Sequence, residues 1–206
     1  MKYQEFQKIF RPYLVFSFLD VKKYRPDFDR RRLSEWSAKG YIKKIVKGYY
    51  TFSDYNIDER FLYLMANTIY RPSYISLTSA LAYYGLIPEG VYSITSISTK
   101  KTTLYKTEIV EFHYKNIKES LFFGYKLLQY RTHFVKIAEP EKAILDFFYF
   151  HKNLKDENDF YELRINEDVF HEIINPEKFM MYKSLYAEKT FSARVDKFLE
   201  FIYAKP

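Results

Sequence analysis

One stretch of the chain, DRRRLSEWSAKGYIKKIVKGYYTF at residues 29–52, constrains the fold more than any other. Asp29 is a good helix N-cap, because its carboxylate can accept hydrogen bonds from the first free backbone N–H groups. Leu33 and Trp36 lie three residues apart and would share one helical face. Gly40 suits the left-handed position after a last helical turn. The stretch therefore predicts a short helix that begins near Asp29 and ends before Gly40.

The residues that follow predict two β-strands joined by a tight turn. Lys47 and Gly48 form the turn, with Gly48 at positive φ. Residues with a preference for strands flank this turn on both sides: Tyr41, Ile42, Ile45 and Val46 before it, and Tyr49, Tyr50 and Phe52 after it. The pair would form a hairpin directly after the helix.

A short helix followed by a basic hairpin is the second half of a winged helix-turn-helix, in which the helix enters a DNA major groove and the hairpin lies along the backbone. If Leu33 and Trp36 face the core, the charged side chains of the helix point outward. Arginine reads guanine through two parallel hydrogen bonds, whereas lysine on a hairpin contacts phosphate. We predict a DNA-binding surface made of Arg30, Arg31, Arg32, Ser34, Glu35, Lys43, Lys44 and Lys47.

The alternative is that the arginine triplet is a solvated helix start and the hairpin an ordinary turn. The triplet argues against this alternative, because three cations occupy a first helical turn, where the helix dipole disfavours positive charge. Because this placement of the arginines does not help folding, we infer that they have another role, and DNA binding is the preferred interpretation.

The distribution of charge supports the same interpretation. Residues 1–52 contain 13 Lys and Arg against 5 Asp and Glu, a net charge of +8. The remaining residues contain 20 basic and 21 acidic side chains, a net charge of −1, so the whole excess of +7 belongs to the first segment. A basic segment attached to a near-neutral one is typical of a DNA-binding domain joined to a second domain.

Composition sets further bounds. Hydrophobic residues make up 48% of the chain and charged residues 29%, which indicates a globular protein. The chain has no cysteine, which excludes disulfides, thiolate zinc sites and a cysteine nucleophile, and we expect a cytoplasmic protein without a membrane partner. Aromatic residues reach 21% and could form stacking platforms for single-stranded nucleic acid, but their even spread favours a role in the core.

The predicted fold class is α+β, with two domains. Residues 1–54 would form the winged helix-turn-helix, with helices at residues 3–10 and from residue 16, and residues 53–56 would be the linker. Residues 57–206 would form a larger α+β domain with a small mixed sheet and C-terminal helices. Its expected strands are residues 93–98, 109–114, 124–130 and 134–137, and its expected helices start near residues 58, 76, 139, 160, 176 and 192.

A search for catalytic chemistry is negative. The histidines (His113, His133, His151 and His171) lack metal-ligand spacing. Glu139 and Glu141 complement a helix dipole, and Asp146 falls between apolar positions of the same helix, so a structural role is favoured for all three. No Gly-rich phosphate loop and no acid pair on adjacent strands is visible. We predict no catalytic, cofactor-binding or metal-binding residues, and a protein that is not an enzyme.

Three stretches together resemble the AbiEi family of type IV toxin–antitoxin antitoxins. They are residues 33–50, which include GYIKKI and KGYY, residues 74–86 (YISLTSALAYYGL) and residues 137–146 (IAEPEKAILD), and the last is the most specific. The resemblance covers most of residues 1–150. It implies that the N-terminal domain binds and represses the promoter of its own operon. It also implies that the C-terminal domain neutralises a cognate nucleotidyltransferase-like toxin in abortive infection.

Two other functions remain open from the sequence. One is a winged-helix transcriptional regulator whose second domain dimerises or senses a ligand. The other is a nucleic-acid-processing enzyme that the winged helix directs to its substrate. The enzyme would need clustered acids on adjacent strands, which the sequence lacks, and a toxin gene beside this one would separate the antitoxin from the plain regulator.

Overall fold

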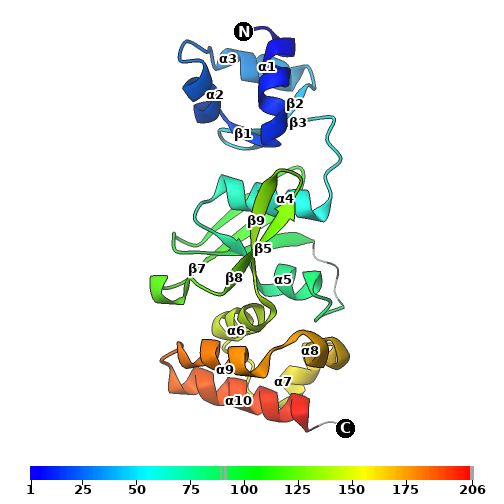
Figure 1. Cartoon of the computed structure of the whole chain (residues 1–206), viewed down its shortest axis with the longest axis vertical. Helices are drawn as coiled ribbons and strands as arrows, with labels where there is room; N and C mark the ends of the chain where they lie inside the picture. The colour runs from blue at the N-terminus through cyan, green and yellow to red at the C-terminus, as the bar shows by residue number, and fades with distance from the viewer. Residues whose placement is uncertain (89, 91, 205–206) are drawn as a thin grey trace.

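The computed structural model describes residues 1–88, 90 and 92–204, and its elements lie in three tiers along the long axis (Figure 1). The N-terminal helices and a small sheet form one end, a larger sheet with its helices forms the middle, and a helical layer forms the C-terminal end. The α+β class predicted from the sequence is confirmed. In this described part, no helix combines the length and the apolar character that crossing a bilayer requires.

The N-terminal tier combines helices with a three-stranded antiparallel sheet in the order β1-β3-β2. Its elements are α1 (Tyr3–Phe10), a 3-10 turn η1 (Arg11–Tyr13), β1 (Val15–Ser17), α2 (Phe18–Tyr24), α3 (Arg31–Ala38), β2 (Ile42–Val46) and β3 (Tyr49–Phe52). The first helix, α3 and both hairpin strands agree with the sequence prediction. The second helix is also present, but it begins at Phe18 rather than at residue 16, because Phe16 pairs with Tyr50 in the sheet.

Capping explains where two of these helices begin. Ser17 caps α2: its hydroxyl accepts from the Asp20 N–H at 3.1 Å, and Asp20 accepts in return from the Ser17 N–H at 2.8 Å. The N-cap of α3 is Arg30 rather than the expected Asp29. Asp29 nevertheless accepts a hydrogen bond from the Arg31 N–H at 2.9 Å, so its carboxylate still satisfies one free donor of the first turn.

Aromatic side chains fill the core of this tier. Phe6 is completely buried, and its ring centroid lies 4.6 Å from that of Trp36 and 5.2 Å from that of Phe16. Leu33 is also completely buried beside Trp36, as the three-residue spacing predicted. This packing attaches one face of α3 to the sheet, and the opposite face is left to solvent.

The middle tier is a six-stranded sheet with two helices before its long strands. Its elements are α4 (Glu59–Ile69), β4 (Tyr74–Ile75), α5 (Leu77–Tyr83), β5 (Ser93–Ser98), β6 (Thr103–Lys106), β7 (Glu111–Asn116), a 3-10 turn η2 (Glu119–Leu121), β8 (Tyr125–Tyr130) and β9 (His133–Ala138). The strand order is β6-β7-β5-β4-β9-β8, with β4-β9 and β5-β7 parallel and the other pairs antiparallel. The predicted small mixed sheet is confirmed, although β4 and β6 were not predicted.

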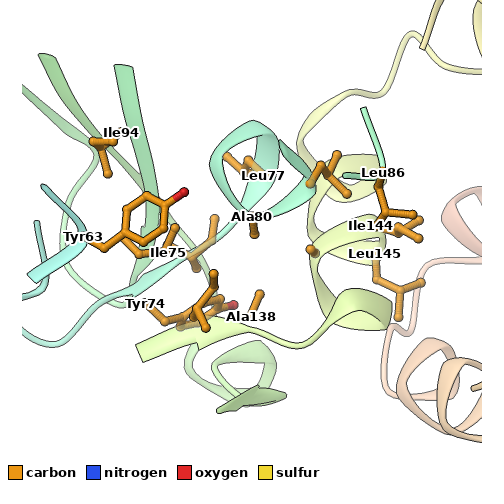
Figure 2. Packing of buried hydrophobic residues seen from close by; sticks show 14 of the residues in the cluster. Tyr63, Tyr74, Ile75, Leu77, Ala80, Leu86, Ile94, Ala138, Ile144 and Leu145 are labelled. Carbon is orange, nitrogen blue, oxygen red and sulfur yellow. The ribbon is translucent and has the colours of Figure 1, made fainter. Parts of the chain in front are cut away.

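The C-terminal tier contains only helices within the described residues: α6 (Pro140–Phe150), α7 (Glu157–Glu162), α8 (Glu167–Ile173), α9 (Pro176–Ser184) and α10 (Lys189–Tyr203). Helix α8 was not predicted. Figure 2 shows how the tiers join: Leu77 and Ala80 of α5 lie between Ile94 of the sheet and Ile144 of α6. Helix α5 is thus the apolar spacer between the sheet and the helical layer.

Several contacts connect the N-terminal tier to the middle one. Arg11 contacts the segment that leads to α4: it forms a salt bridge with Asp54 at 2.8 Å, and its carbonyl accepts from the Tyr55 hydroxyl at 2.5 Å. At the next residue, the Pro12 carbonyl lies 2.7 Å from His133 Nε2 of β9. Leu14 packs into the hydrophobic cluster of the middle tier. The predicted domain boundary at residues 53–56 stays a prediction.

A buried ionic network ties α6 to the sheet and to the residues after α9. Lys142 and Asp146 are completely buried, four residues apart on α6, and form an ion pair. Asp146 also accepts from the Tyr74 hydroxyl at 2.9 Å and from the Ser76 hydroxyl at 2.8 Å, and Lys142 Nζ lies 2.8 Å from the Tyr186 hydroxyl. Burial lowers the pKa of Lys142 from its ordinary value, and the charge of Asp146 opposes that shift.

This network gives a prediction on stability. Lys142→Met leaves the Asp146 charge buried without its cation, which should lower the free energy of unfolding by about 3–5 kcal/mol. Adding Asp146→Asn should recover part of the loss, because the amide oxygen still accepts from Tyr74 and Ser76 but carries no charge. Urea unfolding of the single and double variants measures both effects.

The matched control is Lys183→Met. Lys183 pairs with Asp196, whose side chain is 48% exposed, so this loss should stay near or below about 1 kcal/mol. A double variant less stable than Lys142→Met alone would contradict the charge argument.

Candidate nucleic-acid interface

The helix α3 and the β2–β3 hairpin lie next to each other because Trp36 and Leu33 hold the helix against the core. Gly48 has φ +90° at the hairpin turn, and Gly40 has φ +72° after the helix, so both glycines occupy the left-handed region that the sequence predicted for them. A bulge interrupts the register of the hairpin between Lys44 and Val46. Such a bulge turns the local direction of the strand and its side chains.

The eight residues predicted to contact DNA are all exposed. Arg30, Ser34, Lys44 and Lys47 line one groove of about 390 Å³ between α3 and the hairpin. The structure thus brings helix and hairpin residues together on one surface, which we call the α3–hairpin groove.

The other four predicted residues lie outside this groove. Arg31, Arg32 and Glu35 are on the exposed side of α3. Lys43 lines a neighbouring hollow of about 1040 Å³, between the hairpin and β6, together with Lys106. The predicted set therefore covers a groove, an exposed helix face and an adjoining hollow, and Lys44 and Lys47 line both the groove and the hollow.

The cations of this region are unpaired. In the part of the chain that the structure describes, Arg31, Arg32, Lys43, Lys44 and Lys47 form no salt bridge, and the same holds for Arg30. The Arg30 guanidinium lies 5.4 Å above the Phe18 ring, which fixes its position without neutralising its charge. A surface of unneutralised cations is what a polyanion requires.

Three further residues, which were not among those predicted from the sequence, line the α3–hairpin groove: Ser37, Ala38 and Tyr50. Ser37 lies three residues after Ser34 and seven after Arg30, so helical spacing could have identified it. Tyr50 pairs with Lys44 across the hairpin, and only the strand register shows that it belongs here. The Ser37 hydroxyl can donate to a phosphate oxygen. Tyr50 is only 6% exposed and belongs mainly to the core of the N-terminal tier.

The other candidate groups occupy structural positions. Glu139 contacts Lys178 at 3.3 Å, and Glu141 accepts from the Asn175 N–H at 2.9 Å. Among the described residues, no three His, Asp or Glu side chains gather so that they could hold a metal ion. Lys142 and Asp146 are completely buried, so no substrate reaches them.

Comparisons with protein-family models and with curated proteins find no match to this chain.

Exposure of the cations gives a prediction. The triple change Arg31→Ala, Lys44→Ala and Lys47→Ala should lower the free energy of unfolding by no more than about 1.5 kcal/mol, since exposed substitutions usually change it by about 0.5 kcal/mol each. Urea unfolding followed by circular dichroism measures this. Leu33→Ala is the control and should cost about 2–5 kcal/mol, because Leu33 is completely buried. A loss from the triple change as large as that of Leu33→Ala would make these cations part of the fold.

Proposed function

We propose that this protein is a DNA-binding autorepressor and an antitoxin of a type IV toxin–antitoxin system, and that residues 1–54 form a winged helix-turn-helix. The observation that carries the proposal is the α3–hairpin groove, where Arg30 and Ser34 of the helix face Lys44 and Lys47 of the hairpin. The order of elements, with three helices and a C-terminal hairpin, fits a winged helix. The protein would act in the cytoplasm, where its promoter is.

The groove and the exposed helix face suggest a division of roles on double-stranded DNA. Arg30, Lys44 and Lys47 line a concave surface that suits one phosphate strand. Arg31 and Glu35 project from the exposed face of α3, where base edges of a major groove would lie, and an arginine and a carboxylate are suited to guanine and cytosine respectively.

The antitoxin role comes from the resemblance to the AbiEi family. Two of the resembling stretches, residues 74–86 and 137–146, meet in the buried network, where Tyr74 and Ser76 donate to Asp146. In addition, the Tyr84 hydroxyl donates to the Ala138 carbonyl at 2.7 Å. These motif residues hold the second part of the chain together, so contact with a nucleotidyltransferase-like toxin would use other, exposed residues.

A first prediction separates base reading from phosphate contact. Arg31→Ala should reduce the preference for promoter DNA over random DNA, because each good base contact contributes about 1–3 kcal/mol of discrimination. Lys44→Ala should weaken binding to both DNAs about equally and reduce the salt dependence by about one unit of slope. Fluorescence anisotropy with both duplexes at several salt concentrations measures this.

The matched control is Lys152→Ala, an exposed lysine of the C-terminal tier, which should leave both affinities unchanged. An equal loss on promoter and random DNA for Arg31→Ala would show that α3 does not read bases.

A second prediction separates repression from toxin neutralisation. The joint change of Arg30, Arg31 and Lys44 to Ala should abolish promoter binding, because each removed cation forfeits the release of counterions from DNA. When expressed from an independent promoter, the same variant should still protect cells from the toxin encoded beside its gene. Cell survival after toxin induction is the measurement, with protein level checked. Loss of protection at a normal protein level would show that neutralisation depends on DNA binding or on residues 1–54.

A further inference from the structure

A cleft of about 640 Å³ separates the N-terminal tier from the middle one. Its walls come from β1 and α2 on one side and from α4 and β9 on the other. This volume falls within the range of small-molecule sites in proteins. The cleft is separate from the α3–hairpin groove, and none of the predicted DNA contacts lines it.

Two buried polar groups on the cleft wall lack a hydrogen-bond partner in the described structure. Ser73 is only 3% exposed, and its hydroxyl is unpaired. The Asn67 carboxamide oxygen accepts from the Lys136 N–H at 2.6 Å, which fixes the orientation of the amide and leaves its Nδ2 group as an unpaired donor. A buried polar group without a partner costs about 1–3 kcal/mol, so a ligand that pairs with these groups gains affinity.

The charge of the cleft wall favours an anion. Lys23 and Arg71 line it, and neither forms a salt bridge with any described residue. Among the described residues that line the wall, Asp20 is the only acidic one, and its Oδ2 already accepts from the N–H and the hydroxyl of Ser17. Arginine binds phosphate through two parallel hydrogen bonds, and lysine adds a second positive charge.

The cleft also offers aromatic surface. Phe134 is 58% exposed and Tyr13 is 48% exposed, and both line the cleft. The faces of aromatic side chains are platforms on which a planar base can stack.

We propose that this cleft binds a nucleoside monophosphate. Its phosphate would lie between Lys23 and Arg71, its base against Phe134, and the polar edge of that base against the unpaired groups of Asn67 and Ser73. The phosphate, the face of the base and the polar edge of the base are thus each matched by residues of the cleft wall.

The test is isothermal titration calorimetry on the full-length protein without DNA, so its outcome is independent of the proposed DNA function. The probes are adenosine and guanosine 5′-monophosphate, the two uncharged nucleosides and inorganic phosphate. At least one monophosphate should bind about tenfold or more tightly than its nucleoside, because the nucleoside lacks the charged contacts. Absence of binding by both monophosphates at millimolar concentration would overturn the proposal.

Variants assign the contacts. Arg71→Ala should weaken monophosphate binding about tenfold or more, and Phe134→Ala should weaken it while leaving inorganic phosphate unchanged. Ser73→Ala should weaken it without lowering the urea midpoint, because the hydroxyl that it removes is unpaired in the free protein.

Lys152→Ala again serves as the charge-matched control and should change nothing. Equal affinity of Arg71→Ala and the unchanged protein would overturn the phosphate site. Equal affinity of a monophosphate and inorganic phosphate, insensitive to Phe134→Ala, would overturn the nucleoside assignment.

Discussion

The carboxylate of Asp146 is the point at which the middle and C-terminal tiers are joined. It is completely buried, and it accepts from Tyr74 before α5, from Ser76 at the start of α5, and from Lys142 on its own helix. Burial raises the pKa of Tyr74 well above its ordinary value, and the negative charge of Asp146 raises it further. Both effects keep the Tyr74 hydroxyl protonated and therefore a donor. A charge this deep is stable only because every partner is in place, so the network fixes one arrangement of sheet and helices.

The N-terminal tier depends on a different interaction, the aromatic packing around Phe6 and Trp36. This packing decides which face of α3 is exposed, and therefore where Arg30 and Arg31 lie. The cations at the start of α3 interact unfavourably with the positive end of the helix dipole. The first turn of the helix, as the structure describes it, contains no acidic residue that would compensate them. The Asp29 carboxylate, just before the helix, accepts from the Arg31 N–H and offsets part of this cost. The core packing of α3 therefore determines where the cations of its first turn are exposed.

Sequence patterns predicted those elements whose side chains alternate between core and solvent. The spacing of Leu33 and Trp36 placed α3, and the turn at Gly48 placed the hairpin. The strands that were missed are short: β4 has two residues, β1 three and β6 four, too few for a clear periodicity. They form only because distant partners complete them, as when Val15 pairs with Thr51. Such pairing depends on tertiary contacts, which the preferences of individual residues for strand structure do not predict.

The same limit applies to the sites. Exposure of the arginine triplet could be predicted, because it follows from helical geometry once the buried face is known. Arg30 and Lys47 could also be assigned to one surface, but which of the eight residues share the groove could not, since that depends on the bulge of the hairpin. Burial of Lys142 and Asp146 was not predicted either, because charged residues enter a core only when partners far along the chain pair with them.

The contacts between the tiers connect the cleft physically to the α3–hairpin groove, where we propose that DNA binds. Asp20, on the cleft wall, completes the cap of α2, and α2 precedes α3 by one short loop. The opposite wall includes His133, which is hydrogen-bonded to the Pro12 carbonyl. A ligand that binds both walls favours the arrangement of tiers in which both walls face it. If DNA binding at α3 depends on the same arrangement, the ligand changes the affinity for DNA. Because linkage is reciprocal, DNA would change the affinity of the cleft by the same factor as the ligand changes the affinity for DNA.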